Sequence, residues 1–434
     1  MYTSYIGKKF LKLYNEKKNL NFTGKIFFDE VLFPLFFNDD RHFMHVHGST
    51  FFQKVSEKDI REGQNKHTFR LSRLHRDVNE KKISGSNYVA YAAETPNAVS
   101  SGQVSSIQKE IDEEEIYCSW IGQALSLGVE ERFCLLLSEE DILWYIFEGW
   151  FFYRKYLTQT THVKDKEIEF WNTVWYLNIL NNDFEISSSP NIETDTSVGE
   201  TRIRKIGWSN LIYSLCQHLP NQEIVAYCYK LDKTNTTLGF IKIYLHEITE
   251  MYEFRDKIFV DKTESILSDK EIMQLGTFYN FKSACQLGTI GLKAMEPAKL
   301  REFMSKGSVM YAQGKDFKFN SEESYQYYQL YKIWITAMLN KTDLLHLAEK
   351  IAGALLKFED EGDRGKKIHD TISAEIRKSK SIVEFTDKIS DLLLKSNTDK
   401  TLFKNVVEEV LKMPVDNFPL FITLIRFEYN YQKK

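Results

Sequence analysis

The sequence predicts an α+β fold: a mixed α/β N-terminal region followed by a C-terminal antiparallel helical bundle. From residue 320 onward, apolar residues recur with helical spacing in successive segments joined by short connections, as in antiparallel bundles. Ahead of this, β-rich runs at 224–231 and 238–248 flank a turn-forming stretch and predict a β-hairpin. We expect three regions: a lobe over 1–190, a hairpin and helical middle region over 191–319, and the bundle over 320–434.

The start of the N-terminal lobe is the least regular part of the sequence. Short apolar runs at 26–28 and 31–37 have no periodicity that separates strand from helix. Loose alternation over 45–55 predicts a strand. The stretch 82–106 is rich in Ser, Gly, Ala and Asn, which predicts a loop with one strand at 88–92.

Helical patterns are clearer in the rest of the lobe and beyond it. Ser138 and Asp141 form a capping-box pattern that predicts a helix from 142 to about 156, and a second helix is expected over 165–180. The polar stretch 187–201 reads as an exposed loop or linker. A further helical region is expected over 268–305, with breaks near its glycines and proline. The bundle should contain helices beginning at Asn320 and Thr342, one over 366–377, one capped by Ser381 and Glu384, and two more over 402–411 and 418–429.

Composition places the chain among ordinary globular proteins, with 43% hydrophobic and 27% charged residues. The net charge of −4 excludes a global basic field, so any nucleic-acid-binding surface must be local. The 31 Phe and 23 Tyr fit either an A/T-rich genome or stacking platforms for bases. Five scattered cysteines without a C-x-x-C pair argue against a cysteine zinc site and for a reducing compartment. No signal-type N-terminus and no membrane-spanning run is seen, so we expect a cytoplasmic protein with no membrane partner.

One cluster has residue types that bind metals. Asp39 and Asp40 precede His42, His45 and His47, and alternate positions of a strand point to one face. These side chains are candidates for a divalent metal site, and a metal-dependent hydrolase or nuclease is therefore an alternative function. A polar turn with clustered histidines explains the same residues without a metal, and we expect no cofactor.

The segment from residue 41 to residue 82 is basic. It carries ten Lys or Arg and five Asp or Glu, a net of five positive charges in a chain whose total is negative. Arg70, Arg73 and Arg76 recur every three residues, so one helical face is able to present them to phosphate oxygens, with Lys81 and Lys82 following. A solvated helix face is the alternative interpretation.

Two further stretches are candidates for nucleic-acid contact. In the small-residue loop, Gly102 allows close approach of a backbone, and polar side chains are available for groove edges or phosphates: Asn97, Ser100, Ser101 and Gln103. Such a loop is otherwise a plain connection. Arg202, Arg204 and Lys205 stand beside Trp208, which suits a strand on a nucleic-acid backbone or an edge strand protected by charge.

Motifs of common enzyme classes are missing from the sequence. There is no phosphate-binding G-x-x-x-x-G-K-[ST], no G-x-G-x-x-G, no G-x-S-x-G and no H-E-x-x-H. No nucleophile and base pair stands out either. We therefore expect a protein without catalytic residues, and a structural or scaffold protein with no nucleic-acid role is the remaining alternative.

Three stretches resemble the large subunit of type I CRISPR interference complexes (Cascade). They are GKIFFDEVLFPLF (24–36) together with GSTFFQK (48–54), the loop SGQV (101–104), and the tail NFPLFITLIRF (417–427). The order of an α/β lobe and a C-terminal helical bundle is also similar.

The resemblance implies a non-catalytic subunit of an RNA-guided antiviral complex. Its N-terminal part would lie near the guide RNA end and probe the duplex DNA that flanks the target. Its bundle would contact a target-DNA strand and neighbouring subunits, and the complex would recruit a helicase-nuclease. In this reading the loop 101–104 probes a groove, and Arg70, Arg73 and Arg76 contact phosphates.

Overall fold

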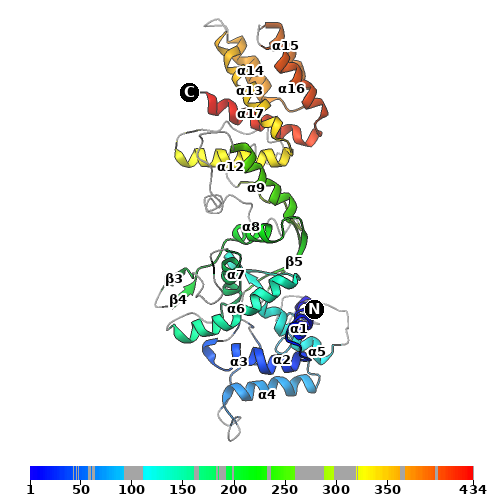
Figure 1. The fold of residues 1–434 in the computed structure, drawn as a ribbon, viewed down its shortest axis with the longest axis vertical. Helices are drawn as coiled ribbons and strands as arrows, with labels where there is room; N and C mark the ends of the chain where they lie inside the picture. Colours follow the sequence, from blue (N-terminus) through cyan, green and yellow to red (C-terminus); the bar gives the residue numbers. More distant parts are fainter. Residues whose placement is uncertain are drawn as a thin grey trace. The chain divides into compact units, whose positions relative to one another are not determined.

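The computed structural model spans residues 1–434, and the chain forms two compact units (Figure 1). Unit 1 comprises Met1–Ile243 and Cys285–Thr289, and unit 2 comprises Tyr244–Ala284 and Ile290–Lys434. The division falls inside the expected middle region, and the three expected regions stay a prediction. The structure describes residues 1–42, 44, 46, 48–56, 60, 64–91, 111–160, 166–181, 184, 192–197, 200–231, 236–259, 288–297, 319, 321–361, 367–395 and 399–433.

Unit 1 is built around two helices that pack unusually closely, α1 (Tyr2–Lys18) and α5 (Glu113–Ala124) (Figure 1). A Cβ atom on Gly7 would lie 1.8 Å from the carbonyl oxygen of Cys118, and one on Gly122 would lie 1.9 Å from that of Thr3. Only glycine permits this approach, because each site faces a backbone carbonyl that has no room to move. The contact fixes α1 on unit 1.

The apolar runs after α1 form helices. The segment consists of α2 (Gly24–Phe27), a π-helical turn η1 (Phe28–Leu32) and α3 (Phe33–Phe36). Phe28 of this segment stacks with Phe37 and Phe51, and all three rings meet Trp120 edge-on. Phe27 and Phe36 pack elsewhere, against Tyr14 and Trp150. Because a helix carries side chains on all its sides, the aromatic rings of this segment reach different parts of the core.

The strand expected over 45–55 is wrong for the described residues of that range, which form turns and irregular backbone. The backbone of Thr50 pairs with Ser86 and with Arg73, so these polar groups are satisfied without a neighbouring strand. The strand expected over 88–92 is likewise wrong over 88–91, where the backbone turns and Tyr91 hydrogen bonds back to Tyr88.

A five-stranded sheet lies in the order β1-β2-β5-β6-β7. The predicted hairpin is confirmed as β5 (Glu223–Lys230) and β6 (Thr236–Tyr244), although the chain turns helical at Leu245 and the second strand ends earlier than expected. β2 (Phe133–Leu136) pairs antiparallel with β5, placing Cys134 opposite Tyr229. The outer strands β1 and β7 are short: Leu127–Gly128 and Thr289–Ile290. A separate pair is formed by β3 (Thr194–Ser197) and β4 (Glu200–Ile203).

Among the remaining helices of unit 1, α7 packs against β1, α6 and α8. The two predicted helices are confirmed as α6 (Glu140–Gln159) and α7 (Ile168–Ile179). The capping box is wrong, because the Ser138 N–H donates to the carboxylate of its neighbour Glu139 and no side chain caps α6. The other helical segments are η2 (Asp40–His42), α4 (Lys66–Asn79), η4 (Glu130–Arg132) and α8 (Trp208–His218).

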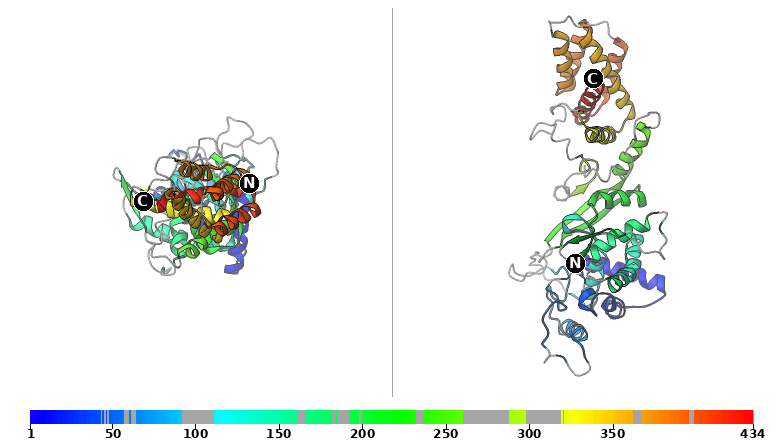
Figure 2. Two further views of the ribbon diagram at one scale, coloured as in Figure 1. Left: turned by 90° about the horizontal axis from the view of Figure 1, so that it is seen from above. Right: turned by 90° about the vertical axis from the view of Figure 1, so that its left-hand side faces the viewer.

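Unit 2 contains the predicted bundle. α17 packs against α12, α13 and α14 (Figures 1 and 2), and α15 and α16 complete the group. The helices are α9 (Leu245–Phe259), α12 (Glu322–Leu339), α13 (Thr342–Asp360), α14 (Ile368–Lys378), α15 (Ile382–Lys395), α16 (Lys400–Lys412), η7 (Val415–Asn417) and α17 (Phe418–Gln432).

The predicted cap of Ser381 is confirmed, because its hydroxyl accepts the N–H of Glu384 at 3.2 Å, while two other helix starts of the bundle differ from the predictions. Ser321, not Asn320, caps α12 through a reciprocal capping box with Ser324. α13 does begin at Thr342, but that residue lies inside the helix and no side chain caps it. Of the helical region expected over 268–305, the structure describes 288–297, which holds β7 and turns.

Charged groups inside the bundle tie its helices together. Lys332 of α12 is only 1% exposed, and its Nζ lies 3.2 Å from a carboxylate oxygen of Glu349 and 3.2 Å from one of Glu428. The hydroxyl of Tyr328 donates to the same Glu428 oxygen at 2.7 Å. Burial raises the pKa of Glu428, and Lys332 opposes that rise. A search of the described residues finds no helix with the length and apolarity needed to cross a bilayer.

Candidate nucleic-acid interface

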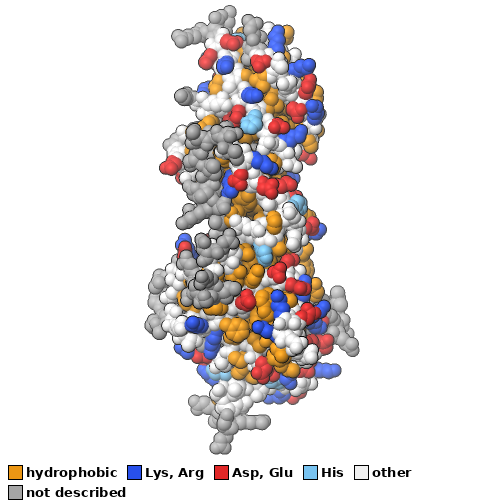
Figure 3. All heavy atoms as spheres, in the orientation of Figure 1, with side chains coloured by type: hydrophobic (Ala, Val, Ile, Leu, Met, Phe, Trp, Pro, Cys, Tyr) orange, Lys and Arg blue, Asp and Glu red, His pale blue; other side chains and the backbone are white. Residues whose placement is uncertain are grey.

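Basic residues are dispersed over the face of the molecule that Figure 3 draws. On the face drawn in Figure 3, Lys and Arg alternate with Asp and Glu over the described parts of both units. A nucleic-acid site therefore has to be sought at particular groups of cations, and the groups that the sequence singles out come first.

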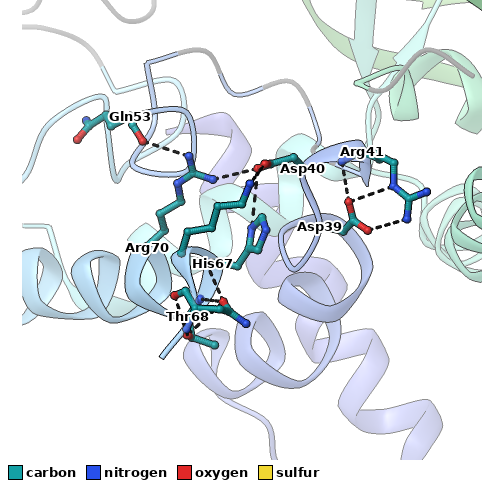
Figure 4. A network of polar contacts seen from close by, with 9 residues as sticks. Asp39, Asp40, Arg41, Gln53, His67, Thr68 and Arg70 are labelled. Carbon is teal, nitrogen blue, oxygen red and sulfur yellow. Dashed lines mark hydrogen bonds and ion pairs between the residues drawn. The ribbon is translucent and has the colours of Figure 1, made fainter. Parts of the chain in front are cut away.

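The basic helix is α4, capped by Asn65 in a reciprocal box with Thr68. Arg70 turns inward, and its side chain is 11% exposed. One of its terminal nitrogens lies 3.1 Å from Oδ1 of Asp40, and the other donates to the carbonyl of Gln53 at 3.2 Å (Figure 4). Arg70 thus fastens the segment 40–53 onto α4.

Arg73, Arg76 and Lys82 also have partners in the chain. The guanidinium of Arg73 donates to the side chain of Thr50 at 2.6 Å and to its carbonyl. Arg76 is exposed and lies 3.3 Å from Asp77, while Lys82 pairs with Glu80. Lys81 is exposed and adopts a left-handed backbone at φ 55°. The structure does not bring the three arginines to one open face, since only Arg76 points to solvent.

The carboxylates of the expected metal cluster are engaged by cations. Hydrogen bonds from Arg41 lower the pKa of Asp39 to about 2. Burial opposes ionisation of Asp40, but hydrogen bonds from Lys66 and Arg70 outweigh it and lower its pKa (Figure 4). His45 and His47 lie outside the described residues, and so does the side chain of His42. No group of three potential ligands comes together among the residues that the structure describes.

The small-residue loop lies outside the described residues. This applies to every residue singled out there: Asn97, Ser100, Ser101, Gly102 and Gln103. Their expected role at a groove stays a prediction.

The third basic group, Arg202, Arg204 and Lys205, gains an arginine from elsewhere in the sequence. Arg202 belongs to β4, and the chain continues past η4, where the N–H of Glu130 donates to the carbonyl of Ile206 at 3.0 Å. This backbone contact brings Arg132 next to Lys205. We call Arg132, Arg202 and Lys205 the Lys205 cluster; Arg204 stands apart from it, paired with Glu193.

The other two cations of the Lys205 cluster affect the ionisation of Lys205. Burial lowers the pKa of the Lys205 ammonium, and the positive charges of Arg132 and Arg202 lower it further against the opposing effect of Glu167. Within the described part of the chain, neither Arg132 nor Lys205 has an ion-pair partner within 4.0 Å. The Lys205 ammonium lies 5.0 Å from the centre of the Phe170 ring. Like charges gathered in this way raise the free energy of the folded state, and a bound anion would relieve it.

The backbone at Arg132 is also under constraint. Glu131 and Arg132 both adopt left-handed conformations, with φ of 56° and 65°. Such residues cost roughly 1–3 kcal/mol each and persist where surrounding contacts hold them. Here the Arg132 carbonyl accepts the N–H of Leu231 at 2.8 Å, which pins the turn to the end of β5.

Near the Lys205 cluster lies a buried polar network. Nε2 of Gln123 donates to the hydroxyl of Tyr229 at 2.8 Å, and that hydroxyl donates to Ser126 at 2.8 Å. Glu169 is fully buried and 3.4 Å from the same Gln123 nitrogen. Burial raises the pKa of Glu169 to about 7. Because it has no access to solvent, this carboxyl is not placed to act on a substrate.

Arg132 is the residue that sequence reasoning missed. It follows Glu130 and Glu131 in a stretch whose local charge is acidic, so its neighbours in sequence give no signal of a basic site. Comparison with known proteins adds nothing to this picture: no family model, curated protein or solved structure matches the chain.

Proposed function

We propose that this chain is a non-catalytic nucleic-acid-binding subunit of a type I CRISPR interference complex. In that role it contacts the end of a guide RNA and the duplex DNA that flanks the target, acts in the cytoplasm, and works with other subunits and a helicase-nuclease. The resemblance at 24–36, 48–54, 101–104 and 417–427 names the complex.

The single observation that carries nucleic-acid binding is the Lys205 cluster. Arg132 and Arg202 lie near enough to Lys205 for their positive charges to lower its pKa, and a constrained turn and a strand pair position them. An anion bound here would offset these positive charges, and a phosphate backbone supplies negative charges at regular spacing. The contact is to backbone, and it carries no sequence preference of its own.

The test is salt-dependent binding by the full chain and a double variant, Arg132→Gln with Lys205→Gln. Binding of a short DNA duplex and of a guide-like RNA is measured by fluorescence anisotropy over a range of salt concentrations. Loss of two duplex phosphate contacts should lower the slope of log K against log salt by about 1.8, at about 0.9 per contact. The matched control removes the same charge from two exposed lysines, Lys404→Gln with Lys412→Gln.

Stability separates a binding role from a structural one. Because neither Arg132 nor Lys205 has an ion-pair partner among the described residues, the double variant should be as stable to thermal unfolding as the parent while it binds more weakly. A double variant with the parent's slope on both nucleic acids would overturn the assignment of the Lys205 cluster. Charge reversal of Arg70 or Arg73 is a poorer test, since both hold the segment 40–53.

A further inference from the structure

Four aromatic rings from distant parts of the sequence meet on the surface of unit 1. Tyr2 lies at the start of α1, with its ring centre 5.6 Å from that of Tyr5, stacked at 25°. The Tyr2 ring also lies 5.4 Å from Tyr227 of β5 and 5.1 Å from Phe240 of β6, the latter edge-on at 89°. Tyr227 and Phe240 are 5.4 Å apart. We call these four residues the aromatic platform.

The aromatic platform has one buried ring and two rings that are largely exposed to solvent. Tyr227 is buried, and its hydroxyl forms a hydrogen bond of 2.8 Å with the hydroxyl of Thr237. This contact restrains the position of the Tyr227 ring. Tyr5 and Phe240, in contrast, are 55% and 58% exposed. Val225, two residues before Tyr227 on the same face of β5, is 39% exposed beside them. Large rings kept in place and left in contact with water indicate a binding surface.

Cations follow the platform along α1. The helix carries Lys8, Lys9, Lys12, Lys17 and Lys18 against the single acid Glu16, which is five minus one, or a net of +4. Lys12 is 79% exposed, and its ion pair with Glu16 is long, at 3.9 Å. Lys17 and Lys18 lie 4.9 Å and 5.6 Å from the ring centre of Trp144. The exposed side of α1 thus runs from aromatic rings through lysines to another aromatic ring.

Several lysines of α1 pair with acids of neighbouring elements. Lys8 lies 3.6 Å from Glu115 and 3.7 Å from Asp112, and Lys9 lies 3.8 Å from Glu140. On β6, Lys242 pairs with Glu223 at 3.1 Å. Partly exposed ion pairs of this kind contribute little free energy, so a phosphate is able to compete for the lysines.

We propose that the aromatic platform and the lysines of α1 form a binding site for single-stranded nucleic acid. Unpaired bases stack on Tyr5 and Phe240, and phosphates of the same strand lie along Lys9 and Lys12. Rings next to lysines suit this ligand, because every base has a face to stack and every nucleotide a charge to neutralise. The site is distinct from the Lys205 cluster, and the inference rests on the proposed function as a nucleic-acid-binding protein.

The experiment measures binding of fluorescently labelled oligo(dT) and oligo(U) strands by the full chain and by two variants, Tyr5→Ala and Phe240→Ala. Both rings are more than half exposed, so removing either should leave the fold unchanged, which circular dichroism verifies. Each variant should bind about 5- to 150-fold more weakly, since one stacked base is lost. The slope of log K against log salt should stay as in the parent. Phe151→Ala on α6 is the matched control and should bind as the parent does, since this ring is 51% exposed and its ring contact is with Phe147.

Lysine variants test whether the phosphates of the strand contact α1. Lys9→Gln with Lys12→Gln should lower the salt slope for a single strand by about 1.4, at about 0.7 per contact. If the parent binds strands but Tyr5→Ala and Phe240→Ala bind equally well, the platform has another occupant, such as a protein, and this inference fails while the proposed function stands. If the parent binds neither duplex nor single strand, both fail.

Discussion

Replacing Glu169 by glutamine tests how unit 1 depends on pH. Burial raises the pKa of this carboxyl to about 7, against an ordinary value of 4.5, and its Oε2 has no hydrogen-bond partner in the part of the chain that the structure describes. The folded state therefore keeps Glu169 protonated at pH values where the unfolded chain has already ionised. Glutamine has the same shape and no charge.

The direction and size of the pH effect on the free energy of unfolding follow from proton linkage. Below pH 4.5 Glu169 is protonated in both the folded and the unfolded state, so it causes no loss of stability. As pH rises from 4.5 to 7, only the unfolded state ionises, so the free energy of unfolding falls. The total loss is the difference of 2.5 between the two pKa values times about 1.36 kcal/mol, or about 3 kcal/mol. Glu169→Gln removes this loss, and the variant should gain about 3 kcal/mol over the parent between pH 4.5 and 8.

The assay is urea unfolding followed by tryptophan fluorescence at a series of pH values. Six of the seven tryptophans belong to unit 1, so the signal reports mainly on that unit. Glu131→Gln, at an exposed position, is the control and should keep the parent's pH dependence. A Glu169→Gln protein whose stability curve runs parallel to the parent's from pH 4.5 to 8 would refute the reasoning, because Glu169 would then not titrate differently on folding.

Two further predictions concern packing and buried charge. Gly122→Ala should destabilise unit 1 by several kcal/mol or prevent its folding, because its Cβ would lie 1.9 Å from the Thr3 carbonyl oxygen; Gly353→Ala, whose Cβ would meet only the end of the Gln432 side chain at 3.1 Å, should change the melting temperature little. Equal melting temperatures for the two variants would contradict the close contact of α1 and α5. Lys332→Met should cost about 3–5 kcal/mol in urea unfolding, since Glu349 and Glu428 lose their shared cation. Adding Glu428→Gln should recover part of that loss; no recovery would show that lost packing dominates.

Much of the fold is encoded locally. Helices α13 to α17 and the hairpin of β5 and β6 fall where apolar spacing and turn residues predicted them, because an amphipathic helix or strand needs only one buried side. The run 24–37 could not be assigned to strand or helix from the sequence. Its aromatic rings face several neighbours, so its apolar residues follow neither a helical nor a strand periodicity. The strand expected over 45–55 failed because Arg73 and Ser86, both distant in sequence, satisfy the polar groups of Thr50.

The candidate sites were likewise only partly predictable from the sequence. By itself the sequence determined which residues are basic and aromatic, and it marked Arg202 and Lys205 and the surplus of Phe and Tyr. Only the tertiary structure decided that Arg70 and Arg73 face inward, that Arg132 joins Lys205, and that Tyr5 meets Phe240 through Tyr2. The physical reason is that a charge or a ring acts over a few ångströms of space. Residues separated by tens or hundreds of positions become neighbours only when backbone pairing and close helix contact bring them together.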